Sequence, residues 1–186
     1  EFRVPQESGD GIYLTLPEIH QILEVPETSL SPSEILSRQL FIIGCFSGLR
    51  VSDYKRLSTK NLIEHDGILM FELHSEKTDS HLIIPVHPVI KNLIDENAGR
   101  PPSRQSDVLI NRNMKRIGQL AGLEEIVRMS RTIGGKRQTT IHKKFELITT
   151  HTARRSFATN AYLSGMDTLD IMSITGHTKE STFLRY

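Results

Sequence analysis

Apolar residues recur at helical spacing in two segments near the start of the chain, and each segment follows a helix N-terminal signal. Thr15 can cap the first helix and Pro17 suits its first turn, while the sequence Ser-Pro-Ser-Glu over 31–34 has the same features. The pattern therefore predicts one helix that ends near Val25 and a second, strongly apolar helix that extends through Phe46.

Two runs of apolar and β-branched residues, 68–73 and 82–85, flank a polar stretch. They predict a β-hairpin with Lys77 near its tip. A further stretch, 124–148, is rich in β-branched residues around a Gly-Gly pair. It predicts either a second hairpin or a long basic loop.

Glycines mark the ends of the predicted helices. Gly48 ends the second helix and places Arg50 at the junction with the next one, and Gly165 and Gly176 end two helices near the C-terminus. The fold class is expected to be mainly α with a small antiparallel β-sheet, an α+β domain. The remaining helices are predicted over 51–57, 88–96, 108–121, 151–164, 168–174 and 179–185.

Composition limits the class of protein further. The chain has 186 residues, of which 37% are hydrophobic and 24% charged, values typical of one globular domain. No apolar run is long enough for a membrane span. Cys45, the only cysteine, lies in the run LFIIGCF and is expected to be a buried structural thiol in a reducing compartment.

The net charge of +1 conceals an uneven distribution. Residues 1–99 carry 8 basic and 15 acidic side chains, residues 100–160 carry 13 and 4, and residues 161–186 carry 2 and 3. The central block therefore has a charge of +9, which suits a protein that places one face on a polyanion. An unevenly charged solvated surface explains the same numbers, so charge alone leaves both interpretations open.

An ordered set of His, Arg and Tyr residues occupies the last 36 residues of the chain. His151 and Arg154 form an H-x-x-R motif, Gly176 and His177 follow it, and Tyr186 comes nine positions after His177. The set supplies an arginine, two imidazoles and a phenol around a helical segment. Such groups can attack a phosphodiester without a metal ion.

This stretch is similar to the catalytic end of the tyrosine recombinases, also called the phage integrase family. Residues 46–53 resemble the family's first arginine motif, and residues 75–79 lie where the family has a lysine on a hairpin loop. The resemblance covers residues 14–186 and implies the DNA breaking–rejoining fold of the recombinase catalytic domain. The sequences HTARRSFATN and ITGHT are most similar to the corresponding sequences of recombinases of Bacteroidetes mobile elements.

The resemblance also implies a domain organisation and partners. Residues 14–186 are expected to form the catalytic domain, and residues 1–13 a linker or residues left by cloning. Nothing in the sequence matches the family's N-terminal core-binding domain, and the chain stops at Tyr186, where family members continue into a segment that docks on a neighbouring subunit. The expected partner is double-stranded DNA at recombination or attachment sites. The full-length protein is expected to be a homotetramer on DNA, this chain a monomer, and the location cytoplasmic and nucleoid-associated.

The activity that the resemblance implies is metal-free cleavage and rejoining of duplex DNA through a 3′-phosphotyrosine, with no cofactor. Attack by a tyrosine adds negative charge to the phosphate oxygens, and the planar fork of an arginine stabilises such charge through two parallel hydrogen bonds. Arg50 and Arg154 are the expected clamps. For Arg50, a structural ion pair with Asp53 is the alternative.

The other catalytic roles concern proton transfer and nucleophilic attack. Lys77 is the expected general acid for the leaving 5′-oxygen, and Tyr186 is the expected nucleophile. His151 is expected to assist proton transfer at the tyrosine or to hydrogen-bond the phosphate, and His177 to donate to a non-bridging oxygen. Each role has a simpler alternative. Lys77 would be an ordinary turn lysine and Tyr186 a tail tyrosine. His151 would be a helix-capping or core histidine, and His177 a turn residue.

Further basic residues are predicted to hold DNA phosphates without reading bases. No aromatic residues interleave with them, so duplex DNA is favoured over a single strand. They are Arg112, Lys115, Arg116, Lys136, Arg137, Lys143, Lys144 and Arg155.

Other functions compete with this interpretation. A type IB topoisomerase or a telomere resolvase would share the chemistry. A DNA-binding relative without turnover should lack part of the catalytic set, whereas all six residues are present here. A metal-dependent nuclease needs a carboxylate cluster and a zinc site needs paired His or Cys ligands, and neither pattern is evident.

Overall fold

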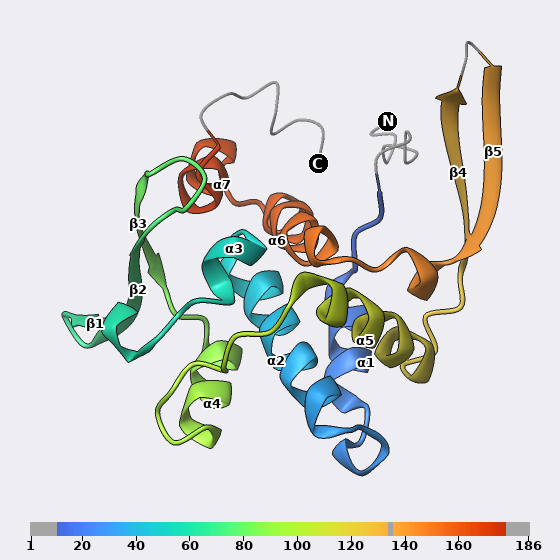
Figure 1. Cartoon of the computed structure of the whole chain (residues 1–186). Helices are drawn as coiled ribbons and strands as arrows, with labels where there is room; N and C mark the ends of the chain where they lie inside the picture. Colours follow the sequence, from blue (N-terminus) through green and yellow to red (C-terminus); the bar gives the residue numbers. More distant parts are fainter. Residues whose placement is uncertain (1–10, 134–135, 178–186) are drawn as a thin grey trace.

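Helix α2 (Pro32–Ser47) lies at the centre of the fold in the computed structural model, which describes residues 11–133 and 136–177. Helices from both ends of the chain pack around it (Figure 1). Its helical neighbours are α1 (Leu16–Glu24), α3 (Val51–Tyr54), α4 (Pro88–Glu96), α5 (Asp107–Leu120) and α6 (Thr150–Leu163).

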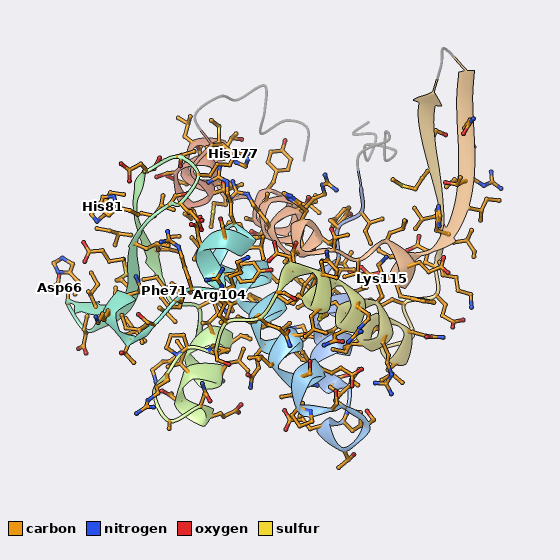
Figure 2. All side chains as sticks on the ribbon, in the orientation of Figure 1. Asp66, Phe71, His81, Arg104, Lys115 and His177 are labelled. Atoms are coloured by element: carbon orange, nitrogen blue, oxygen red, sulfur yellow. The ribbon has the colours of Figure 1, made fainter. Side chains whose placement is uncertain are left out.

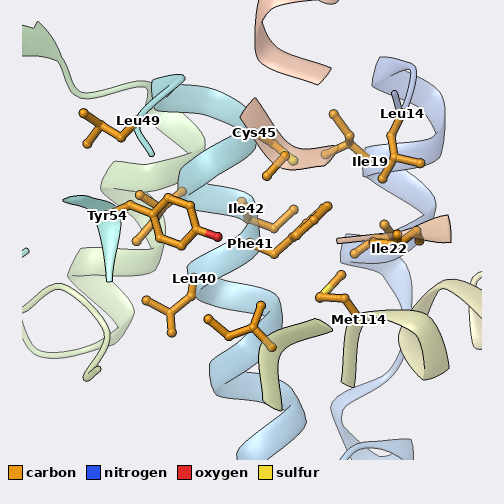
Figure 3. Close-up of a cluster of buried hydrophobic side chains, with 14 of the residues drawn as sticks. Leu14, Ile19, Ile22, Leu40, Phe41, Ile42, Cys45, Leu49, Tyr54 and Met114 are labelled. Carbon is orange, nitrogen blue, oxygen red and sulfur yellow. The ribbon is translucent and has the colours of Figure 1, made fainter. Parts of the chain in front are cut away.

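The side chains of α2 explain its central place. Leu40, Phe41, Ile42 and Ile43 are consecutive and fully buried, so the helix is apolar on every side at this level. Figure 3 shows this part of the core, where side chains of α1 and α5 face those of α2. Each such side chain contributes about 1.5–3 kcal/mol by burial, which makes α2 the scaffold for the elements around it.

Both predicted N-terminal signals form complete capping boxes. The Thr15 backbone N–H donates to Glu18 Oε2 at 2.7 Å, and the Ser31 N–H donates to Glu34 Oε2 at 2.8 Å. The side-chain hydroxyls of the two caps accept from the glutamate N–H groups in return. The predicted starts of α1 and α2 are confirmed.

A three-stranded antiparallel sheet lies beside the helices, in the order β1-β2-β3. The predicted hairpin is confirmed as the second and third strands, while the first strand was not predicted, because only two of its four residues are apolar. The missed signal is the Asp66-Gly67 turn, in which both residues have positive φ, as in two-residue hairpins. The strands are β1 (Leu62–His65), β2 (Ile68–His74) and β3 (His81–Pro85).

The stretch 124–148 forms a second hairpin rather than a long basic loop. Strands β4 (Ile126–Ile133) and β5 (Lys136–Lys143) pair with each other, and Ile126 lies opposite Lys143. The two strands extend away from the helical body as a ribbon (Figure 1). Of the two predictions, the hairpin is therefore correct.

The remaining helices follow the predictions with one difference in length. α6 and α7 (Thr168–Thr175) agree with them, whereas α3 ends at Tyr54 and not at residue 57. The chain leaves the helix in a turn that buries Leu57, which is 6% exposed. In the described part of the chain, three short 3₁₀ turns lie at 27–29, 59–61 and 144–147. The helix predicted over 179–185 lies outside the described residues.

The predicted class, mainly α with a small antiparallel sheet, is confirmed. Within the described ranges, no helix has the length and apolar character needed to cross a bilayer.

Candidate active site

Two helix C-termini form the base of the site. α2 and α7 end at Gly48 and Gly176, whose φ angles of 66° and 64° suit glycine and turn the chain away from each helix. Arg154 Nη1 donates to Gly48 O at 2.8 Å and its Nη2 donates to Thr175 O, while Arg50 Nη2 donates to Gly176 O at 3.3 Å. Both guanidinium groups therefore lie at the negative ends of helix dipoles.

α6 supplies Arg154 and His151 from the same face, one turn apart. The start of this helix is fixed by α5, because Asn111 Oδ1 accepts from the Thr150 N–H at 2.7 Å. Arg154 is 3% exposed, so its charge lies just below the surface, while His151 is exposed at the start of the helix.

The environment of His151 is positively charged, with contributions from three segments of the chain. Partial desolvation of the imidazole lowers the pKa of His151, although the residue as a whole is exposed, and the positive charges of Arg155, Arg154, Lys77 and Arg50 lower it further, in that order. Lys77, on the β2–β3 hairpin, therefore contributes to the electrostatic environment of His151. His151 is therefore neutral near pH 7 and able to accept a proton.

His177 lies directly after the cap of α7 and has a defined tautomer. The Thr175 hydroxyl donates to Ile171 O at 2.6 Å, so it accepts from His177 Nδ1–H at 2.8 Å. His177 Nε2 is then unprotonated and accepts from Arg154 Nη2 at 3.3 Å. In this tautomer His177 has no N–H directed at a phosphate oxygen, which differs from the expectation that it donates to a non-bridging oxygen. Burial, Arg154 and Arg50 lower the pKa of His177 to about 4, in agreement with this neutral form.

Asp53 connects the Arg50 segment to the lysine hairpin. Its fully buried carboxylate accepts from Ser75 Oγ at 3.1 Å and from the Glu76 N–H at 2.8 Å. The alternative of an ion pair between Arg50 and Asp53 is not what the structure has: Asp53 pairs with Arg56 at 3.2 Å, and Arg50 donates to Ser75 Oγ at 3.2 Å. Asp53 thus holds the base of the hairpin.

The turn that carries Lys77 is closed by backbone hydrogen bonds. The Ser75 N–H donates to Ser80 O at 2.9 Å, and the Asp79 N–H donates to Ser75 O at 2.8 Å. Arg56 also donates to His74 O at the end of β2. The Lys77 side chain is exposed on this closed turn, so its anchor is rigid while its ammonium group reaches solvent.

Asp53 and Ser75 are site residues that the sequence predictions did not assign. Asp53 stands three positions after Arg50, within the first arginine motif, and was considered as an ion-pair partner of that arginine. A buried carboxylate in the first arginine motif was the available signal, but its hydrogen bonds to residues more than 20 positions away depend on the fold.

One predicted phosphate-binding residue is wrong. Lys144 is 7% exposed and its Nζ pairs with Glu18 at 2.7 Å and with Glu125 at 3.5 Å. Burial opposes its charge, but the hydrogen bond and the negative charge of Glu18 raise the pKa of Lys144 above the usual value. This lysine fastens the end of the β4–β5 ribbon to α1 and is not available to DNA.

Two others already have acidic partners at the surface. Arg116 pairs with Glu34 at 2.8 Å, and Lys143 pairs with Glu124 at 3.3 Å. Both side chains remain about half exposed, so these pairs are weak and a phosphate can compete for the cations.

The other predicted phosphate ligands differ in what surrounds them. Arg112 and Lys115 are exposed on α5, and Figure 2 shows Lys115 at the edge of that helix. Arg155 packs on the N-terminal segment, because a Cβ atom on Gly11 would lie 2.0 Å from its Nη1. The side chains of Lys136 and Arg137, and the whole of Tyr186, lie outside the described residues.

The potential metal-ligating side chains of the described part of the chain are dispersed, and its cysteine is buried. None of its His, Cys, Asp and Glu side chains form a group of three or more that could hold a metal ion. Cys45 is buried, and burial raises the pKa of its thiol, as expected for a structural residue.

The helical body and the three-stranded sheet form the fold of a tyrosine recombinase catalytic domain, as the comparisons with known proteins show. A model of the phage integrase family matches residues 13–186, so the chain belongs to that family.

Solved structures agree on the fold. XerH site-specific recombinase, bound to a palindromic difH substrate after cleavage, has 19% identity and a TM-score of 0.68 over 97% of this chain and 49% of its own. XerA recombinase has 18% identity and a TM-score of 0.65, with coverage of 94% and 59%. The catalytic domain of bacteriophage HP1 integrase has 17% identity and a TM-score of 0.61, with coverage of 95% and 87%.

The chain therefore spans about half the length of XerH and nearly all of the HP1 catalytic domain. At these identities the similarity concerns the fold. A search of curated proteins found no match.

Proposed function

We propose that the chain is the catalytic domain of a site-specific DNA recombinase, which cleaves and rejoins duplex DNA through a 3′-phosphotyrosine at Tyr186. The observation that carries the proposal is the convergence of cations and imidazoles from four separate segments of the chain. These residues are Arg50, Lys77, His151, Arg154 and His177.

The arginines stabilise the charge that develops on the phosphate. A guanidinium group has five N–H donors, and the two hydrogen bonds of Arg50 orient it without using the others. Removal of one such donor from a preorganised site typically costs about 10²- to 10³-fold in rate. The backbone carbonyls that hold Arg50 and Arg154 are in place before the substrate arrives, so this stabilisation needs no rearrangement of the base of the site.

Proton transfer is divided among three groups. Neutral His151 accepts the phenol proton of Tyr186 as the tyrosine attacks the phosphorus atom. Lys77 gives a proton to the 5′-oxygen as the P–O bond breaks, which leaves a 5′-hydroxyl and a 3′-phosphotyrosine. Attack by a 5′-hydroxyl reverses these transfers, so rejoining needs no ATP, cofactor or metal ion.

The partner is double-stranded DNA at a recombination or attachment site, in the cytoplasm at the nucleoid. XerH is bound to difH substrate and lambda integrase to a COC′ core site in the structures that this fold resembles. The full-length protein acts as a homotetramer on DNA, and the chain alone is a monomer.

A tyrosine-to-phenylalanine exchange tests the proposal. Tyr186→Phe removes the nucleophilic hydroxyl and keeps the ring. With a nicked suicide substrate, the unmodified protein should form a covalent protein–DNA adduct that survives denaturing electrophoresis and persists in EDTA. Tyr186→Phe should form no adduct but still shift DNA in a native gel.

Tyr162 provides the matched control, because it is 47% exposed on α6 and lies outside the proposed machinery. Tyr162→Phe should form the adduct at the unmodified rate. An adduct that persists in Tyr186→Phe, or that disappears from the unmodified protein in EDTA, would overturn the proposed function.

A further inference from the structure

A basic groove of about 660 Å³ lies between the end of α3 and the loop before α5. Its walls are the segments 55–59 and 100–104. Four cations line it, namely Lys55, Arg56, Arg100 and Arg104. Among the described residues that form the lining there is no acidic side chain, so the groove is suited to an anion.

The wall that carries Arg100 and Arg104 is rigid. Pro101 and Pro102 are buried, and the buried Gln105 amide donates to Ser33 O of α2 at 3.0 Å. Gln105 also accepts from the Ser37 hydroxyl, which in turn accepts from Asn113 Nδ2 of α5 at 2.9 Å. This polar network fixes the loop to α2 and α5.

The guanidinium groups of Arg100 and Arg104 extend from this fixed loop towards solvent. Both residues are exposed, and the structure describes no ion pair for either of them. By contrast, Lys55 pairs with Asp107 at 2.6 Å and so joins the opposite wall to the start of α5. An external anion can therefore pair with Arg100 and Arg104 without displacing a carboxylate partner, which gives these two cations the lowest free-energy cost of pairing in the groove.

The groove is linked to the candidate active site by hydrogen bonds through one buried carboxylate. Arg56 lines the groove and pairs with Asp53, which accepts from Ser75, and Ser75 accepts from Arg50. In the view of Figure 2, Arg104 and His177 are labelled on opposite sides of α3. The groove and the candidate active site therefore share the structural support that Asp53 provides.

The chemistry of the lining favours phosphates over bases. The described lining has no aromatic side chain on which a base could stack, whereas Ser58, Thr59 and Ser103 add hydroxyl donors to the four cations. We propose that this groove binds backbone phosphates of the DNA duplex, with Arg100 and Arg104 as the principal ligands. This proposal deepens the function proposed above and rests on it for the identity of the polyanion.

Salt dependence of binding tests the groove. Each phosphate contact to duplex DNA adds about 0.9 to the slope of log affinity against log salt concentration. Arg100→Ala with Arg104→Ala should therefore reduce the slope by about 1.8, measured by fluorescence anisotropy with a labelled duplex of arbitrary sequence. Between about 50 and 200 mM salt, the fall in affinity should be about 12-fold smaller than for the unmodified chain.

Two variants control for charge and for folding. Lys60→Ala with Lys91→Ala removes the same charge from exposed positions outside the groove and should leave the slope unchanged. Arg100→Lys with Arg104→Lys keeps the charge and should retain most of the slope. Equal loss of slope in the groove variant and in the Lys60 and Lys91 variant would overturn the proposal, because it would show an effect of net charge alone.

A free anion is the other source of the same chemistry, and tripolyphosphate is the probe for it. The double variant Arg100→Ala with Arg104→Ala could keep the salt slope of DNA binding but lose thermal stabilisation by tripolyphosphate. That result would assign the groove to a small anion and overturn the DNA proposal. These measurements use uncleaved DNA, so they are independent of the adduct test. A negative salt-slope result therefore does not count against Tyr186 as the nucleophile. Absence of the covalent adduct likewise does not count against DNA binding by the groove.

Discussion

Asp53 offers the most demanding test of how the site is assembled. Asp53→Ala removes a fully buried carboxylate that accepts three hydrogen bonds, from Ser75, Glu76 and Arg56. Hydrogen bonds to a charged group contribute about 1.5–3 kcal/mol each, but the Arg56 side chain is 43% exposed and can be hydrated instead. We expect a loss of about 3 kcal/mol in the free energy of unfolding.

The assay for stability is thermal or urea unfolding followed by circular dichroism. For a chain of this size, about 3 kcal/mol corresponds to a decrease of about 6–12 °C in Tm. Ser75→Ala is the smaller control, because it removes one of the three donors and leaves the other two in place. It should lower Tm by less than half as much.

The consequence for catalysis is measured at a temperature at which every variant is folded. If Asp53 acts by positioning the hairpin, Asp53→Ala should slow adduct formation because Lys77 loses its place as general acid, a role that typically supplies about 10²- to 10⁴-fold. The double variant Asp53→Ala with Lys77→Ala should then be no slower than Lys77→Ala alone. If the effects of the two substitutions on the activation free energy of adduct formation are additive to within about 0.5 kcal/mol, the positioning role of Asp53 is refuted.

Two further predictions concern proton transfer. Lys77→Ala should slow cleavage with little effect on DNA binding. A substrate with a 5′-bridging phosphorothioate should restore the rate of this variant, because the sulfur leaves with less acid assistance. If the rate is not restored, Lys77 is not the general acid. The pKa of His177 is about 4 in the folded chain and about 6.5 when unfolded, so the unfolded state takes up a proton first as the pH falls through this window. Stability should therefore fall by about 2 kcal/mol from pH 6.5 to 4, after allowance for solvent screening, and His177→Gln should lack this component in urea titrations.

The parts of the fold that depend on local chemistry were predictable from the sequence. Capping boxes begin α1 and α2, and αL glycines end α2 and α7, because these signals act within a few residues of where they stand. Strand β1 was missed because its apolar signal is only Leu62 and Ile63, and the strand depends on pairing with β2.

The catalytic motifs were also visible in the sequence, whereas the partners of charged residues were not. Lys144 and Arg104 both belong to the same basic segment of the chain, and composition counts them equally. The fold brings Lys144 against Glu18, 126 residues away, and leaves Arg104 exposed beside a groove. Which cation faces a carboxylate is decided by tertiary packing, and that information lies outside any local pattern.

The hydrogen bonds of Arg154 to Gly48 O and Thr175 O have a consequence for protein engineering. A side-chain substitution cannot delete a main-chain carbonyl. The two hydrogen bonds that position this guanidinium therefore do not depend on the identity of most residues around it. Libraries that vary the surfaces of α5 or of the β4–β5 ribbon should therefore leave the position of Arg154 unaltered. The positions to keep fixed are Gly48 and Gly176, where a Cβ atom would disfavour the backbone geometry that presents the carbonyls.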